Sequence, residues 1–144
     1  MEKGNLSIAV LMAEAQENRC VSTLSLDPKT ITVVGEAIGL AASKRLLRLA
    51  DPNVAMVVMN GSIAGCLRLV SGLTRACDVP VLVLSLRDER LYAERALCAG
   101  ARGFVMADAL PQVLMAAIRT VSQGDVYLSS EAQAKVLERF CDVA

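Results

Sequence analysis

Short apolar runs that recur along the chain constrain its fold more than any other feature of the sequence. Four runs of four to six residues are continuous rather than alternating, and they span 8–13, 31–34, 54–59 and 81–84. A shorter fifth run, 103–106, follows a turn-like segment at 99–103. Strands covered on both faces have such continuous apolar sequences, whereas strands with one solvent face alternate. The runs therefore predict buried strands of a parallel sheet.

Segments with helical periodicity separate these runs. The clearest spans 110–121, where apolar residues recur at i, i+3, i+4, i+7, i+8 and i+11 and Pro111 stands in the first turn. Another begins with Asp88 as N-cap and stops at Gly100, and weaker ones cover 16–26, 39–50 and 62–76. Strand and helix thus alternate five times, at roughly 20–25 residues a unit, and right-handed crossovers turn this order into a doubly wound α/β fold. We expect a five-stranded parallel sheet with flanking helices.

The length and the tail suggest one domain and an extension. A chain of 144 residues is expected to form a single compact unit, which we place at 1–125. The remaining residues, 126–144, are predicted to form a tail with an extra C-terminal helix from Glu131 to about Cys141. Tyr127 and Phe140 provide two of the four aromatic residues, and we interpret them as closing the bottom of the core.

Composition excludes several classes of function. The chain has no histidine, which excludes His-based triads, His-ligated metals and an imidazole base. Its 15 basic and 15 acidic residues give no net charge, which is wrong for sequence-independent nucleic-acid binding. The five cysteines never form C-x-x-C, and we interpret them as reduced and mostly buried. With neither a signal peptide nor a membrane span in the sequence, we expect a cytoplasmic protein without membrane, metal or cofactor.

Three segments of the second half, 81–85, 96–104 and 118–129, resemble the receiver domain of NarL/FixJ-type (LuxR-like) response regulators. The segment 33–37 is similar to the second strand of that family, and 51–54 to the entry into its third strand. The resemblance covers about residues 7–130. It implies a flavodoxin-like, CheY-like fold and a part in two-component signal transduction and transcription regulation, and no enzymatic activity.

The resemblance also implies a phosphorylation pocket, which this chain has largely lost. In the family, two acids after strand one hold magnesium and an aspartate at the end of strand three accepts the phosphoryl group, while a hydroxyl and a lysine after strands four and five sense it. The matching positions here are Glu14, Ala15, Val58, Ser85 and Ala107. No carboxylate occurs between Asp51 and Asp78. No lysine occurs between Lys44 and Lys135.

The chain is therefore predicted to be a degenerate receiver, or pseudo-receiver. Ser85 and Phe104, the family's hydroxyl and switch aromatic, are the two features that persist. They have two interpretations: a coupling that still moves, driven by something other than phosphate, or a helix cap and an ordinary core aromatic. Arg102 precedes the fifth strand, at its amino end, and is not expected to replace the lysine.

We expect a phosphorylation-independent signalling module that acts as a homodimer or with a partner protein. It is interpreted as the N-terminal regulatory part of a transcription regulator that binds DNA only through a C-terminal helix-turn-helix domain missing from this chain. A stand-alone module is the alternative. The charged stretch 87–95 and the apolar fifth helix are alternative interaction faces. One alternative function is a small-ligand-binding α/β domain with an uncharged pocket near Ala13, Val58, Ser85 and Ala107. Another is an active receiver that uses Glu14 as the acceptor.

Overall fold

The computed structural model describes residues 6–14, 29–59, 62–85, 92–129 and 133. Five parallel strands form one sheet in the order β2-β1-β3-β4-β5. The strands are β1 (Leu6–Met12), β2 (Ile31–Ile38), β3 (Val54–Met59), β4 (Val81–Ser85) and β5 (Gly103–Met106). The helices are α2 (Leu40–Ala50), α3 (Ile63–Ala76), α4 (Ala93–Ala99) and α5 (Pro111–Ser122). The predicted doubly wound α/β fold is therefore confirmed.

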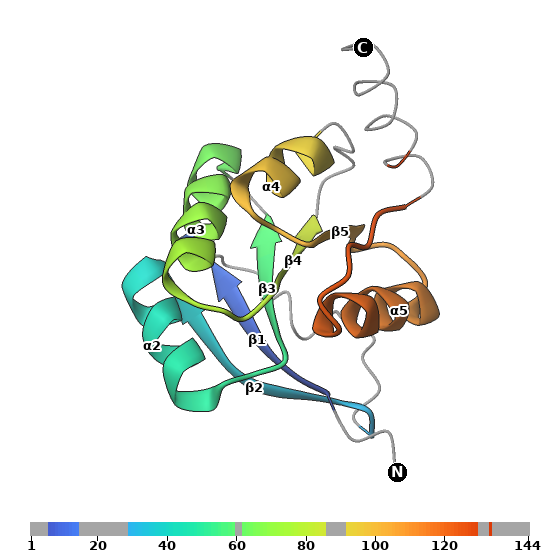
Figure 1. Ribbon diagram of the computed structural model, residues 1–144, viewed down its shortest axis with the longest axis horizontal. Coiled ribbons are helices and arrows are strands. Elements are labelled where there is room, and N and C mark those ends of the chain that lie inside the picture. The colour runs from blue at the N-terminus through green and yellow to red at the C-terminus, as the bar shows by residue number, and fades with distance from the viewer. Residues whose placement is uncertain (1–5, 15–28, 60–61, 86–91, 130–132, 134–144) are drawn as a thin grey trace.

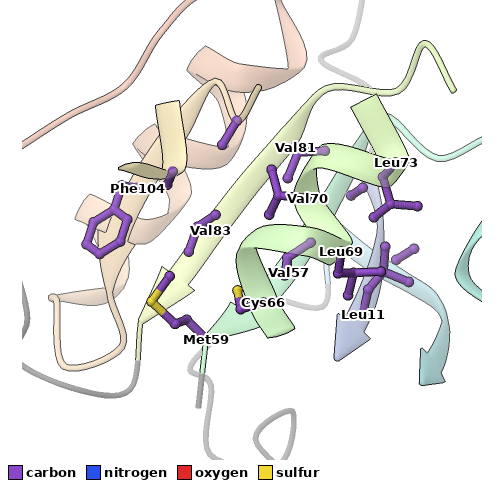
Figure 2. Packing of buried hydrophobic residues seen from close by; sticks show 14 of the residues in the cluster. Leu11, Val57, Met59, Cys66, Leu69, Val70, Leu73, Val81, Val83 and Phe104 are labelled. Atoms are coloured by element: carbon purple, nitrogen blue, oxygen red, sulfur yellow. The ribbon is translucent and has the colours of Figure 1, made fainter. Parts of the chain in front are cut away.

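Helices cover both faces of the sheet (Figure 1). One apolar cluster joins the sheet to α2, α3 and α4, and a second joins the opposite face to α5. Every residue of β3 and β4 is buried, as continuous apolar runs predict for strands covered on both sides. Within the first cluster, Figure 2 shows Cys66, Leu69 and Leu73 of α3 lying over strand residues such as Leu11 and Val57.

Local sequence signals explain where several helices begin and end. Ser62 caps α3, since its Oγ accepts a 3.0 Å hydrogen bond from the N–H of Gly65. Pro111 is the first residue of α5, where a missing N–H costs nothing. Gly100 ends α4 with φ at 116°, a conformation that favours glycine. The helix expected at 16–26, the Asp88 cap and all of the C-terminal helix except Gln133 lie outside the described residues.

Strand β2 is longer than its apolar run predicts. The sequence predicts a strand at 31–34, whereas β2 continues to Ile38 and has exposed residues such as Glu36. The reason is its position at one edge of the sheet, where, among the described residues, the strand pairs with β1 alone and part of it faces solvent. A register shift between Ile8 and Ala9 in this pairing adds a bulge to β2.

The opposite edge of the sheet is paired with a segment that follows α5. The N–H of Tyr127 donates to the carbonyl of Arg102 at 2.9 Å, and the N–H of Phe104 donates to the carbonyl of Tyr127 at 3.2 Å. Tyr127 thereby forms a parallel bridge with Gly103, and Leu128 is buried in the core. These contacts begin within the segment predicted as tail, and they pair with the first part of the outer edge of β5.

The cysteines differ in environment. Cys66 is buried and Cys77 is partly buried, but Cys98 is exposed. Cys98 thus differs from the mostly buried cysteines that the sequence suggests, because α4 is short and buries Ala93 and Ala96 instead. Within the described ranges, no helix is both long enough and apolar enough to cross a membrane.

Candidate functional site

Val58 lies in an apolar row near the carboxyl end of β3. It pairs in register with Met12 of β1 and Leu84 of β4, and its side chain is only 2% exposed. Its cluster includes Leu114 and Ile118 of α5. This is the position where the family resemblance places a phosphoryl-accepting aspartate. An ionised carboxylate in this row would lose its water without gaining a partner.

Ser85 and Ala107 come together at the neighbouring strand ends. Ser85 is fully buried at the end of β4, in register with Met59 on one side and Met106 on the other. Ala107 directly follows β5, and its N–H donates a 2.7 Å hydrogen bond to the carbonyl of Ser85. The methyl group of Ala107 offers no cation to a ligand at this point, since the family's lysine is missing here.

The positions of Ser85 and Phe104 bear on the two interpretations given for them above. Phe104 is 3% exposed and belongs to the cluster beneath α3 and α4, so it is a core aromatic in this structure (Figure 2). Ser85 is not the cap of α4 in the described part of the chain, because the N-cap position of that helix is Tyr92. Arg102 lies at the amino end of β5, away from the carboxyl ends of the strands, as expected. Its Nη1 donates a 3.2 Å hydrogen bond to the carbonyl of Gly124.

Glu14 lines a hollow at the carboxyl end of β1. The hollow has a volume of about 390 Å³, and its lining residues are Ala13, Glu14, Gly39, Leu40, Ser62, Gly65, Arg68 and Leu69. It is therefore bounded by the first residues of α2 and α3. Ala15, the matching position of the second acid, lies outside the described residues.

This hollow is charged and differs from the uncharged pocket expected near Ala13, Val58, Ser85 and Ala107. Glu14 and Arg68 give it one carboxylate and one guanidinium, and of those four residues it contains Ala13 alone. The contribution of Arg68 was missed from the sequence. A signal was present, because Ser62, Gly65 and Arg68 recur every three residues of α3 and thus share a side of that helix.

The donor set does not fit the magnesium ion that the family resemblance implies. Magnesium binds oxygen ligands, usually one or two carboxylates together with substrate phosphates. Of the five expected pocket positions, Glu14 alone is a carboxylate. No three His, Cys, Asp or Glu side chains come together among the residues that the structure describes. We therefore derive no step that requires a metal.

Cys66 is the thiol nearest to the beginning of α3, and its chemistry is that of a core residue. Its side chain is 1% exposed, and this burial raises the pKa of the thiol to about 11. A thiol with so high a pKa is protonated at neutral pH and is a poor nucleophile. This environment of Cys66 agrees with the interpretation of the cysteines as mostly buried residues.

The strand order, the flanking helices and the arrangement of the strand ends define a CheY-like receiver domain. No protein-family model matches the sequence. The transcriptional regulatory protein UhpA of Salmonella typhimurium is 38% identical over 71 residues, which cover 46% of this chain and 36% of UhpA. The methanol utilization control regulatory protein MoxX of Paracoccus denitrificans is 30% identical over 112 residues, or 75% of this chain and 50% of MoxX. The chain thus spans at most half the length of these relatives.

A solved receiver domain agrees with these relatives. The signal receiver domain of the response regulator NarL from Mycobacterium tuberculosis superposes with a TM-score of 0.62 and 25% identity, covering 84% of this chain and 98% of that domain. The chain belongs to the receiver domains of the NarL/LuxR-type response regulators.

Proposed function

We propose that this receiver domain signals without accepting a phosphoryl group. The observation that carries the proposal is the apolar row around Val58, at the position where the family has its acceptor aspartate. Phosphoryl transfer needs an acceptor and a cation that neutralises the developing charge. Val58 stands in place of the family's acceptor aspartate and Ala107 in place of its lysine, so the family's route to phosphorylation lacks both groups.

The proposed role is regulatory rather than enzymatic. We infer that the domain is the cytoplasmic N-terminal part of a transcription regulator, because its relatives include transcriptional regulatory proteins about two to three times as long as the matched segment. DNA would then be bound by a C-terminal helix-turn-helix domain outside this chain. A domain that is not switched by phosphate keeps one surface available, so dimerisation or a partner protein transmits the signal.

The test is incubation with a small-molecule phosphodonor and magnesium, followed by intact mass measurement. We expect no gain of a phosphoryl group, whereas a receiver with an intact acid pocket, treated in parallel, gains one. A stoichiometric gain that is labile at high pH would overturn the proposal. The Glu14→Gln variant then identifies the acceptor, since loss of that gain would assign it to Glu14.

A small ligand is the second candidate, and the hollow beside Glu14 and Arg68 favours it. With one carboxylate and one guanidinium in its lining, the hollow suits a polar ligand rather than the neutral one that an uncharged pocket would take. A thermal-shift screen of polar metabolites tests this function. A shift that disappears in Arg68→Ala would favour the ligand, and the absence of any shift would leave the signalling role ahead.

A further inference from the structure

A second hollow lies at the β2 edge of the sheet, away from the strand ends discussed above. Its volume is about 520 Å³, and its lining residues are Met12, Glu36, Ala37, Ile38, Ala42, Arg45, Leu46 and Leu49. Six of these eight residues are apolar. One wall is the last part of β2, and the other is α2.

Helix α2 extends its apolar side towards this hollow. It buries Ser43 and Leu47, and Ala42 and Leu46 also pack against the first core cluster. Leu49 continues this side of the helix, since Ala42, Leu46 and Leu49 follow the spacing i, i+4 and i+7, but Leu49 is exposed. The core therefore does not cover the whole apolar side of α2, and Leu49 is left for a contact of its own.

Two large apolar side chains that line this hollow are exposed. Leu49 is 80% exposed and Ile38 is 48% exposed. The other exposed large apolar residues of the described part lie elsewhere in the fold, Leu40 in the hollow beside Glu14 and Leu110 and Val126 near the two ends of α5. Contiguous exposed apolar surface marks a site of interaction more often than scattered single residues do.

The backbone of β2 is available at the same place. Within the described residues, β2 pairs with β1 on one side and with no strand on the other. At the opposite edge of the sheet, the backbone of Tyr127 pairs with the beginning of β5. The segment that contains it follows α5 (Figure 1). An open edge strand of eight residues is a template for pairing with another strand.

The charges of the hollow indicate what pairs with it. Its two charged residues have opposite signs and stand on opposite walls, Glu36 on β2 and Arg45 on α2. In a dimer with a two-fold axis the same patch of both copies is in contact, so every contact between two different residues occurs twice. Glu36 of the first copy can therefore lie opposite Arg45 of the second, and Arg45 of the first opposite Glu36 of the second. The zero net charge of the whole chain means that two copies do not repel each other at long range.

We propose that a second copy of this chain docks on the β2–α2 edge about a two-fold axis, with the two Leu49 side chains in contact and Glu36 of each copy opposite Arg45 of the other. This inference assigns the face through which the chain dimerises. The role of that dimer in signalling rests on the proposed function. The proposed dimer makes β2 and α2 the interaction face, in place of the two faces suggested by the charged stretch 87–95 and by α5.

The first experiment compares surface variants by sedimentation equilibrium, from about 1 µM to about 1 mM chain, a range that covers weak and moderate dimers. Leu49→Glu is expected to raise the dimer dissociation constant at least roughly tenfold. Leu110→Glu is the matched control, since Leu110 is also exposed, at 60%, but lies at the start of α5. Circular dichroism checks that both variants keep the fold.

The second experiment exchanges the charges of residues 36 and 45. If the partner were a different protein, its own charges would be unchanged and the double variant would not restore binding. Glu36→Arg and Arg45→Glu are each expected to weaken the dimer roughly threefold to tenfold, and the double variant is expected to restore it. Restoration supports the two-fold arrangement. A double variant as weak as the single ones overturns it.

Two further outcomes overturn the inference without touching the proposed function. A wild-type chain that stays monomeric over the whole range excludes this dimer, and a dimer that weakens in Leu110→Glu but not in Leu49→Glu places the interface elsewhere. The phosphodonor experiment decides the absence of phosphorylation independently of both results.

Discussion

Thr74 of α3 is joined to Ala99 of α4 by a hydrogen bond of 3.1 Å from its Oγ1 to the Ala99 carbonyl. The two helices therefore meet where α4 ends. Gly100 follows directly, and a Cβ built on it would lie 2.5 Å from the same Thr74 oxygen. Thr74 thus fills the space that any side chain at position 100 would need.

The first prediction concerns this close approach. Gly100→Ala is expected to lower the free energy of unfolding by about 1–3 kcal/mol, because φ at 116° strains an L side chain and the new methyl group overlaps Thr74. Urea denaturation measures the loss. Gly124→Ala is the control: its φ is also positive, at 88°, but nothing lies within 4 Å of its Cβ position. Equal losses at both positions would show that contact with Thr74 contributes nothing.

The second prediction concerns the apolar row at the end of β3. Val58→Asp is expected to lower the free energy of unfolding by about 3–5 kcal/mol at neutral pH, because its carboxylate would be buried between Met12 and Leu84 without a partner. Burial disfavours the ionised form and so raises the carboxyl pKa. The loss should therefore shrink as the pH falls and the carboxyl group becomes protonated.

Val58→Thr is the matched control for that experiment, since threonine has nearly the same shape and no charge. It is expected to cost about 1–2 kcal/mol, independent of pH in the acidic range. Urea denaturation at several pH values compares the two variants. If Val58→Asp proved as stable as the wild type at neutral pH, the row around Val58 would have to be open to water.

The fold was predictable from the sequence where burial is uniform. The run at 54–59 coincides with β3 because both faces of a central strand are covered, so every residue is apolar. The end of β2 was not predictable in this way, since Glu36 interrupts the apolar pattern in a strand that has a neighbour on one side only. Apolarity identifies central strands, whereas an edge strand tolerates charge.

The candidate site was predictable in part, for a similar reason. The position of Val58 follows from its place at the end of a strand, and the order of the strands brings it beside Leu84. The hollow beside Glu14 was not predictable, because the presence of Arg68 in its lining depends on how α3 is rotated against the sheet. That rotation is decided by packing with neighbouring elements and leaves only a weak periodic signal in the sequence.

The third prediction concerns the buried thiol of Cys66. Burial raises its pKa from 9.0 to about 11, so the folded protein holds the proton more tightly than the unfolded chain does. The resulting stability, on the order of 2–3 kcal/mol, is fully present below pH 9 and is lost as the pH rises through 11. The Cys66→Ala variant lacks this contribution at every pH.

The measurement is the difference in the free energy of unfolding between wild type and Cys66→Ala, determined by urea denaturation at alkaline pH. Titration of all other groups cancels in this difference. We expect the advantage of the wild type to decline through the window between the two pKa values. A constant difference throughout would mean that the thiol of Cys66 titrates normally in the folded state.

The fourth prediction concerns the segment that pairs with β5. A chain ending at Asp125 is expected to lose roughly 2–4 kcal/mol of stability, because it lacks the two backbone hydrogen bonds of Tyr127 and the buried side chain of Leu128. A chain ending at Ser129 keeps all three and serves as the control. Thermal unfolding compares the two chains, and equal midpoints would contradict the prediction.

The pairing of Tyr127 with β5 also limits how far the sheet can grow. In the described part of the chain, Tyr127 occupies the beginning of the β5 edge, whereas β2 offers its edge along eight residues. A molecule with two open edges can propagate head to tail into a filament, whereas a molecule with one can add a neighbour once and then stops. The few residues after α5 thus hinder growth at the β5 edge, and the proposed assembly through β2 is expected to end at two copies.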